Sequence, residues 1–263
     1  FSQEIEEAKK SKIKTAIERE KILEIPLSEI RNQDLGDLVK VKGFVSVEPG
    51  VLGSQIFYLA GSGVQIYSSQ KDFPNLKIGD YVEVVGELAE FKNETRIKIS
   101  TKDDIKILES QSPPQPKEVK TGEIDEDLEG SLVMITGQVI ERQSNYLYLD
   151  DGSGEIKVYF KRTTGIKKPK LKDGDWLKIV GIVTQYGEEY RILPRYQTDI
   201  ELIEKPTEFD KFQAAGFLSE TKPLFEKINS LSKINHSEKI KYLSLSAIVL
   251  LIILIAILIK RKK

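Results

Sequence analysis

Tyrosine and lysine alternate with apolar residues along two short segments, and these side chains are the best suited to chemistry in the chain. The residues concerned are Tyr146, Tyr148, Lys157, Tyr159 and Lys161. Because successive side chains of a β-strand point to opposite faces, two strands here would present all five on one face. Aromatic rings stack on bases and cations follow phosphates, so this pattern is typical of a surface for single-stranded nucleic acid.

A run of positive charge extends this pattern. Residues 156–172 contain seven basic side chains and no acidic one, and Arg162 belongs to this run. Arg191 lies on a later segment that we expect to join the same surface. Two structural alternatives stay open, since tyrosine is common on exposed strands and a lysine-rich loop is often simply solvated.

Composition excludes much catalytic chemistry. The chain has no cysteine and one histidine, His236, so thiolate sites, zinc centres and Ser-His-Asp catalysis are not expected. Lysine and arginine number 40 against 41 acidic residues, so anion binding would need a local patch. The acidic segment 123–129 lacks the glycine and ligand spacing of a calcium loop. We expect no catalytic residue, metal or cofactor, and therefore no enzyme.

An internal repeat organises the chain. The segment Leu38–Val45 recurs as Leu132–Val139, and Leu76–Gly86 recurs as Leu171–Gly181. The proline-rich segment Ser112–Pro116 lies between the copies and has no capacity for helix or strand. The repeat predicts two domains of one kind that fold independently.

Each copy has five segments with the alternation of short strands. In the first copy they are Val39–Val45, Phe57–Leu59, Val64–Tyr67, Tyr81–Leu88 and the interrupted Arg96–Ile107. In the second copy they are Leu132–Val139, Tyr146–Leu149, Ile156–Phe160, Trp176–Val183 and Tyr190–Ile203. Gly43 and Gly137 lie inside the first strand, where a small closed barrel needs a bulge or sharp coil.

The repeated segments carry a resemblance to a known fold. The residues that carry it are Gly137–Val139, Tyr148–Ile156, Leu171–Asp175 and Val180–Gly181. The chain resembles tandem OB-folds, especially those of the tRNA-anticodon-binding type and those attached to secreted bacterial nucleases. The likeness covers about 26–110 and 113–206, roughly two-thirds of the chain.

This resemblance implies an all-β fold of two five-stranded barrels. It also implies a ligand face on the outside of strands two and three, for oligonucleotides, oligosaccharides or proteins. In the first copy Tyr58 and Tyr67 align with Tyr148 and Tyr159, but Gln65 replaces a lysine. Arg96 on the fifth strand could compensate for that loss. We expect this copy to bind weakly or to act as a spacer.

The C-terminal segment reads as a membrane anchor. Residues 242–259 carry no charge and would span roughly 27 Å as a helix, close to the thickness of a bilayer core. The basic tail 260–263 favours a cytoplasmic C-terminus with the barrels outside the cell. A tail-anchored protein with cytoplasmic barrels is the alternative. Because the chain begins with Phe1, we expect an export signal, and a nuclease or other domain, upstream.

The predicted organisation has seven parts. They are a charged helical linker (1–25), OB-fold 1 (26–110), a proline-rich linker (111–116), OB-fold 2 (117–206), a juxtamembrane stalk (207–241), a transmembrane helix (242–259) and the basic tail (260–263). The predicted function is binding of nucleic acid, with single-stranded DNA as the expected ligand, by a single-pass protein of the bacterial cell surface. The alternative is a non-catalytic stalk that binds protein or glycan.

Overall fold

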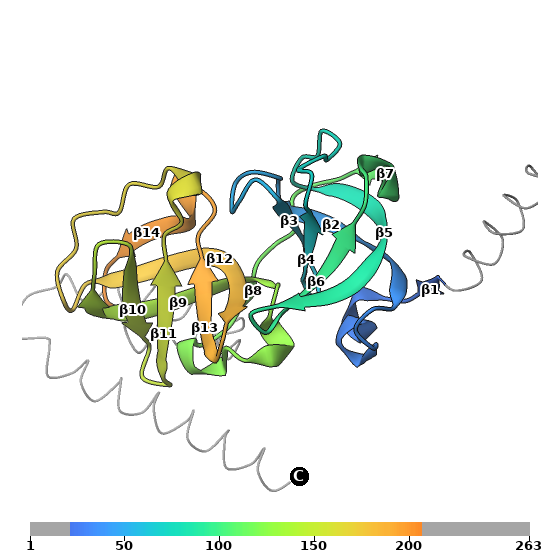
Figure 1. The fold of residues 1–263 in the computed structure, drawn as a ribbon. Helices are drawn as coiled ribbons and strands as arrows, with labels where there is room; N and C mark the ends of the chain where they lie inside the picture. The colour runs from blue at the N-terminus through green and yellow to red at the C-terminus, as the bar shows by residue number, and fades with distance from the viewer. Residues whose placement is uncertain (1–21, 207–263) are drawn as a thin grey trace, which may run out of the picture. The chain divides into compact units, whose positions relative to one another are not determined.

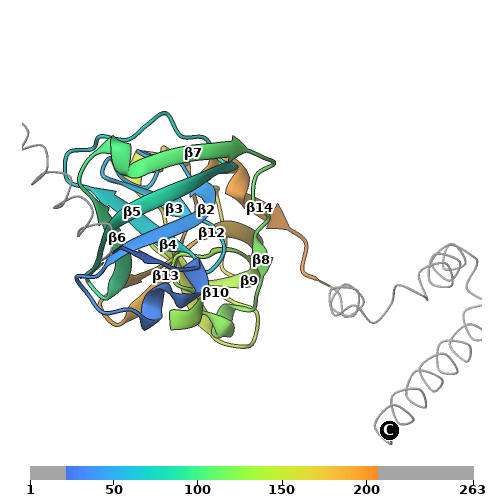
Figure 2. The same ribbon diagram turned by 90° about the vertical axis from the view of Figure 1, so that its right-hand side faces the viewer.

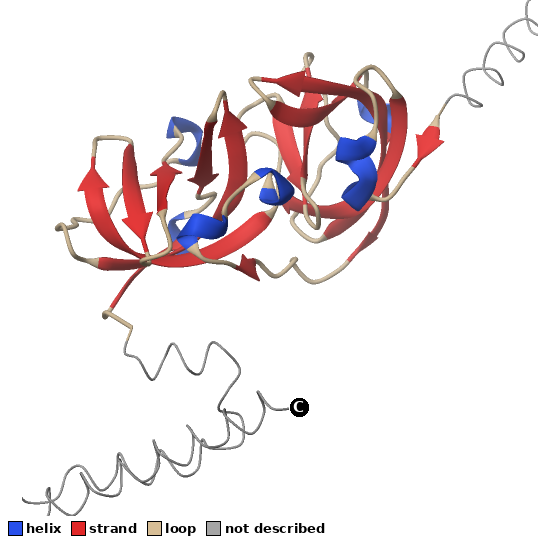
Figure 3. Cartoon of the chain, turned by 90° about the horizontal axis from the view of Figure 1, so that it is seen from below, coloured by secondary structure: helices blue, strands red, loops and turns tan. Residues whose placement is uncertain are grey.

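The computed structural model of the chain describes residues 22–206. The predicted stalk, transmembrane helix and basic tail, and most of the N-terminal linker, lie outside the described residues. Strands dominate the described part, and its helices are short 3-10 turns (Figure 3). None of the helices between residues 22 and 206 is long and apolar enough to cross a membrane.

The first copy forms a closed five-stranded barrel (Figure 1). Its strands are β2 (Leu38–Val47), β3 (Ile56–Leu59), β4 (Val64–Ser68), β5 (Asp80–Phe91) and β6 (Glu94–Ile99). Pairing of β5 with β2 closes the barrel, and β4 runs parallel to β6. Accessory elements are β1 (Leu23–Glu24), η1 (Leu27–Asn32), η2 (Lys102–Asp104) and β7 (Ile105–Ser110). Since β1 pairs with β2, the sheet begins inside the segment expected to be a linker.

The second copy repeats this arrangement. Its barrel strands are β9 (Leu132–Arg142), β10 (Tyr146–Asp150), β11 (Glu155–Tyr159), β12 (Trp176–Tyr186) and β13 (Glu189–Leu193). Pairing of β12 with β9 closes this barrel, and β11 runs parallel to β13. Accessory elements are β8 (Lys117–Glu118), η3 (Thr121–Glu123), η4 (Glu126–Leu128), η5 (Arg162–Thr164), η6 (Gln197–Asp199) and β14 (Ile200–Ile203).

Strand order and closure make both copies OB barrels. In each, the third strand pairs with the fifth, the fifth with the fourth, and the fourth with the first. The predicted last strand of each copy divides into two. In the first copy β6 pairs with the second half of β5, and after η2 the chain returns as β7 along the first half (Figure 2).

The barrel glycines act differently from the prediction. The register of β2 on β3 shifts between Val45 and Val47, and β9 shifts on β10 near Val139, so neither bulge lies at a glycine. Gly43 instead faces Leu27 of η1, where a Cβ would approach the leucine Cδ1 to 2.7 Å. The glycine gives room for η1 to close this end of the barrel with Leu27 and Ile30, both buried in its core.

Each barrel has its own apolar core, and a third cluster joins the two. We call it the inter-barrel cluster; its buried members are Val47, Leu52 and Tyr58 of the first barrel and Leu132, Ile182 and Leu193 of the second. Both barrels belong to one compact unit of the chain. Separating them would expose these side chains to water, so we expect their unfolding to be coupled, contrary to the independence predicted from the repeat.

Candidate nucleic-acid interface

The outer face of β10 and β11 carries the predicted aromatic and basic side chains. The alternation is confirmed: Leu147, Leu149, Ile156, Val158 and Phe160 are buried in the second barrel's core. The side chains between them point outward and are partly exposed. Cross-strand pairing sets Tyr148 opposite Lys157 and Tyr146 opposite Tyr159.

Three of these outward side chains form one contact group, which we call the tyrosine–lysine cluster: Tyr146, Tyr148 and Lys157. The two rings meet edge to face, with centroids 5.8 Å apart. Lys157 Nζ lies 4.7 Å from the ring centroid of Tyr146 and 5.4 Å from that of Tyr148. The lysine therefore holds both rings in place on the sheet.

An acidic residue that the sequence analysis did not identify lies beside this cluster. Lys157 Nζ donates hydrogen bonds of 2.6 and 2.8 Å to the two carboxylate oxygens of Glu189, and Tyr148 Oη donates one of 3.1 Å. Partial burial lowers the pKa of Lys157, but the contacts with Glu189 and Tyr148 raise it overall. Lys157 is thus a charged lysine whose charge Glu189 largely neutralises.

A second group, the arginine–tyrosine stack, consists of Tyr159, Tyr186 and Arg191. The arginine's guanidinium carbon lies 5.1 Å from the Tyr159 ring centroid and 4.7 Å from that of Tyr186. Its Nε donates a 3.2 Å hydrogen bond to Thr184 Oγ1. Parallel pairing of β11 with β13 sets Arg191 beside Lys157, so the two groups are neighbours. Sequence reasoning missed Tyr186, although it ends an outward-facing row on β12.

The remaining predicted cations of the second copy lie elsewhere. Lys161 Nζ donates a 2.8 Å hydrogen bond to the carbonyl oxygen of Leu52 in the first barrel. Burial lowers the pKa of Lys161, as expected for an amine held between two barrels. Arg162 opens η5 and is exposed. The structure therefore brings Lys161 to the inter-barrel contact instead of the ligand face.

In the first copy Tyr58 lies in the interior. It is 1% exposed and belongs to the inter-barrel cluster, so its ring offers no face for a base. Its Oη donates a 2.7 Å hydrogen bond to Glu94 Oε1 and accepts one of 2.7 Å from Gln65 Nε2. The prediction that Tyr58 binds nucleic acid does not fit this position. The alternation did place Tyr58 on the outside of its own barrel, but the second barrel covers that outside.

Tyr67 and Arg96 lie together on the first barrel. The Arg96 guanidinium carbon is 4.2 Å from the Tyr67 ring centroid and 4.9 Å from that of Phe91, a residue the sequence analysis did not single out. This arrangement repeats the arginine–tyrosine stack: Tyr67 corresponds to Tyr159 and Arg96 to Arg191. Phe91 and Tyr186 also correspond, since each ends the fourth strand of its barrel.

Polar contacts complete the junction between the barrels. Arg31 on η1 donates a 2.5 Å hydrogen bond to the carbonyl oxygen of Glu129 and lies 3.2 Å from its carboxylate. Arg195 donates a 2.8 Å hydrogen bond to the carbonyl oxygen of Ser46. Gly63 and Gly130 touch through their backbones, and a Cβ on Gly63 would lie 1.9 Å from the Gly130 carbonyl carbon.

Two carboxylates are buried at this junction. Glu129 is fully buried; its Oε1 accepts a 3.0 Å hydrogen bond from the Thr95 backbone amide, and burial raises its pKa. Glu94 is 7% exposed. Burial, opposed by the hydrogen bond from Tyr58, raises the pKa of Glu94 to about 7. The carboxylates also repel each other, so packing and charge compete at the junction.

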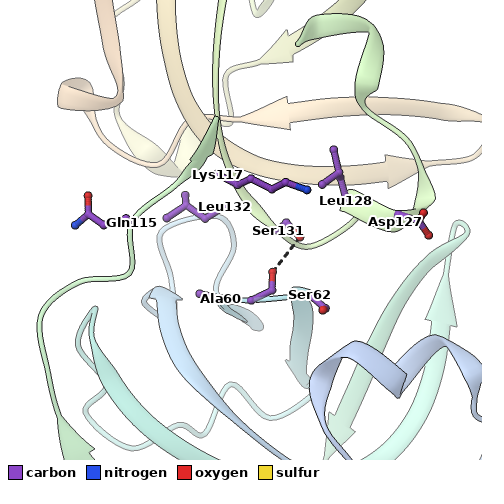
Figure 4. Close-up of a pocket in the computed structure, with 9 residues that line it drawn as sticks. Ala60, Ser62, Gln115, Lys117, Asp127, Leu128, Ser131 and Leu132 are labelled. Atoms are coloured by element: carbon purple, nitrogen blue, oxygen red, sulfur yellow. Dashed lines mark hydrogen bonds between the residues drawn. The ribbon is translucent and has the colours of Figure 1, made fainter. Parts of the chain in front are cut away.

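A small cavity of about 250 Å³ opens beside the junction (Figure 4). Ala60, Gly61 and Ser62 of the β3–β4 turn line one side, and Leu128, Ser131 and Leu132 line the other. Ser131 Oγ crosses it to donate a 3.1 Å hydrogen bond to the Gly61 carbonyl oxygen. The direct bond across its width marks this cavity as a packing gap beside the barrel contact.

Comparison with known proteins gives likenesses of about one barrel's length. No family model and no curated protein matches the chain. Among solved structures, an OBody bound to hen egg-white lysozyme is 24% identical, with 35% of this chain and 99% of that chain covered and a TM-score of 0.28. The OB domain of MM0293 from Methanosarcina mazei is 21% identical over 36% of this chain and 91% of its own, with a TM-score of 0.30. The second OB-fold domain of replication protein A from Methanococcus maripaludis is 20% identical over 35% of this chain and 100% of its own, with a TM-score of 0.26.

Proposed function

We propose that the second barrel binds single-stranded nucleic acid on the outer face of β10, β11 and β13. The observation that carries the proposal is the adjacency of the tyrosine–lysine cluster and the arginine–tyrosine stack on one face. Rings already held by cations lose little conformational entropy when a base stacks on them, and every base presents a π-face. Binding rather than catalysis is the proposed role, and single-stranded DNA is the proposed ligand.

The first barrel has a different proposed role, as a support for the second. Its corresponding ligand position, Tyr58 with Gln65, is buried against the second barrel. This burial also favours the alternative of a protein- or glycan-binding stalk, because one of two ligand faces is taken up by packing. The membrane anchor at 242–259, the location at the bacterial surface and an upstream nuclease or other domain remain proposals from the sequence.

Fluorescence anisotropy of a labelled oligothymidylate against the full chain, kept in non-ionic detergent because 242–259 is apolar, tests the proposal. Tyr148→Ala should weaken binding by about 1–3 kcal/mol and leave its salt dependence nearly unchanged, because stacking is not ionic. Arg191→Gln should instead reduce the salt slope by about 0.7 for each lost phosphate contact.

Tyr81→Ala is the matched control, a partly buried tyrosine of the first barrel whose ring packs on Phe44. It should leave the affinity unchanged. Absence of binding at low salt would reject the proposal and favour the stalk. Binding that survives Tyr148→Ala would reduce it to nonspecific charge attraction.

A further inference from the structure

The two barrels carry the same aromatic–arginine–aromatic arrangement at corresponding places. In the first barrel Arg96 lies between Tyr67 and Phe91, and in the second Arg191 lies between Tyr159 and Tyr186. The outer ring of each arrangement is open to solvent: Phe91 is 50% exposed and Tyr186 is 46% exposed. Large exposed rings beside cations suit stacking of an external planar group.

The turns that follow these two outer rings touch each other. Lys92 Nζ donates a 2.7 Å hydrogen bond to Tyr186 Oη and lies 4.2 Å from the centre of the Tyr186 ring. The Gly187 amide donates a 2.9 Å hydrogen bond to the Lys92 carbonyl oxygen, and Asn93 Nδ2 donates one of 3.3 Å to the Gly187 carbonyl oxygen. Asn93 Nδ2 also donates a 3.5 Å hydrogen bond to Glu188 Oε1, so four hydrogen bonds join the β5–β6 and β12–β13 turns (Figure 1).

These contacts connect the two arrangements into one row of rings and cations. We call it the joined hairpin track; in order, its members are Tyr67, Arg96, Phe91, Lys92, Tyr186, Arg191 and Tyr159. At its second-barrel end, Tyr159 pairs across the strands with Tyr146 of the tyrosine–lysine cluster.

The charges of the track differ from that of Lys157. The ion pairs found within residues 22–206 use other cations, so none of Lys92, Arg96 and Arg191 is in direct contact with a carboxylate there. Lys157, in contrast, is paired with Glu189. Three cations spaced by exposed rings are complementary to a chain that alternates phosphates with bases.

We propose that a single strand bound by the second barrel continues over the joined hairpins onto the first barrel. Phe91 stacks a base, and Lys92 and Arg96 contact phosphates, so the site is longer than one barrel provides. This inference rests on the proposed function. It places a ligand contact of the first barrel at the β5–β6 turn, although Tyr58 on the outer face of β3 and β4 is buried.

The test measures binding of the full chain to a short oligothymidylate of about 5 nucleotides and a long one of about 15, by anisotropy in non-ionic detergent. The long strand should bind more tightly. Phe91→Ala should lower the long-strand affinity about tenfold, and Lys92→Gln should reduce the long-strand salt slope by about 0.7. Neither change should alter short-strand affinity, and Phe91→Tyr should retain the long-strand gain.

Matched controls are Leu202→Ala and Lys77→Gln. Leu202 is 56% exposed on β14, which pairs with the end of β12 opposite to Tyr186, and Lys77 is an exposed lysine of the first barrel. Both variants should bind as the unaltered chain does. Urea unfolding of Lys92→Gln checks that loss of the hairpin bond has not separated the barrels.

The outcomes separate the inference from the proposed function. Failure of both oligonucleotides to bind would reject the proposed function and the inference with it. Short-strand binding without a length gain would reject the inference alone. If Phe91→Ala still bound the long strand more tightly than the short one, the inference would also be rejected, since a longer strand offers more binding registers to any single site. If Phe91→Ala or Lys92→Gln weakened binding of the short and the long strand equally, the β5–β6 turn would serve barrel packing and not ligand contact.

Discussion

The two barrels share one strand order and one set of outward positions, yet they use them differently. Tyr58 and Tyr148 occupy equivalent places on the second strand, each opposite its partner on the third. The ring of Tyr148 is partly exposed beside a charged pair, whereas Tyr58 is 1% exposed beneath the other barrel. The comparison shows that an outward position of this fold stays available to a ligand only where no neighbouring domain covers it.

The substitutions between the copies match this difference. Lys157, opposite Tyr148, corresponds to Gln65, opposite Tyr58. A lysine buried at the junction would carry the cost of desolvating its charge, while a glutamine amide satisfies Tyr58 with a hydrogen bond and no charge. The first copy therefore carries an uncharged residue, Gln65, at its buried position. The second carries a charged residue, Lys157, at its partly exposed position.

The largest expected effect is on stability, and it separates the two equivalent tyrosines. Tyr58→Ala should lower the free energy of unfolding by about 3–5 kcal/mol, because it empties a packed aromatic site. Tyr148→Ala should cost less than about 1 kcal/mol, because its ring is already partly hydrated. Urea denaturation of the full chain measures both. Similar losses for the two variants would mean that the barrels are not packed together in solution.

The sequence predicted the barrels well and their junction poorly. Alternation and repeat located all ten barrel strands, the inward leucines and valines of β10 and β11, and the outward tyrosines. The junction depends on contacts between copies, which a periodicity within one strand does not describe. A usable signal was nevertheless present, since Leu132, Ile182 and Leu193 are apolar at positions that point away from their own barrel's core.

The candidate site was predicted in part for the same reason. Tyr146, Tyr148 and Lys157 meet as the strand pattern required. Glu189 and Tyr186 were missed because they come from β13 and β12, and only the folded sheet brings β13 beside β11 and β12 beside β13. Lys161 was assigned to the ligand face, since nothing in the local pattern shows that the backbone of Leu52 lies within its reach.

The second-largest expected effect is a pH dependence of the free energy of unfolding, which arises from the buried carboxylates of the junction. The folded-state pKa of Glu94, raised to about 7 from 4.5, means that the folded state binds its proton more tightly than the unfolded state. Its contribution is therefore complete below about pH 4.5 and is lost as the pH rises through about 7. The loss amounts to about 3 kcal/mol.

Glu94→Gln should flatten that profile, and thermal unfolding across this pH range measures it. Glu90→Gln, at an exposed site on the neighbouring strand, is the control and should keep the profile of the unaltered chain. Part of the slope should remain in Glu94→Gln, because burial also raises the pKa of Glu129. An unchanged slope would show that Glu94 is hydrated and the junction open.

A smaller effect compares two glycines of the β3–β4 turn. Gly61 and Gly63 both have positive φ, +102° and +51°, so alanine is strained at either. A Cβ on Gly63 would overlap Gly130 of the second barrel, whereas a Cβ on Gly61 would meet open space. Gly63→Ala should therefore cost about 1–3 kcal/mol more than Gly61→Ala. Equal costs in urea denaturation would contradict the close contact.

The smallest predicted effect is a gain of binding on the exposed barrel. Glu189→Gln removes the carboxylate that neutralises Lys157 and leaves an amide that can still accept from Tyr148. The released charge should raise affinity for a single strand about two- to fivefold, a range that matches the modest worth of a partly exposed ion pair. The salt slope should steepen by about 0.7, since one more phosphate contact forms.

Glu188→Gln removes the same charge from the same turn without touching Lys157, and so controls for the overall field. Its contact is with Asn93. If the gain came from net charge, the two variants would bind alike. If it comes from Lys157, the gain should vanish when Glu189→Gln is combined with Lys157→Gln, because the double-mutant cycle removes the one pairing that the first change released. The first barrel offers no corresponding gain, since Gln65 has no charge to release and lies where no strand can reach it.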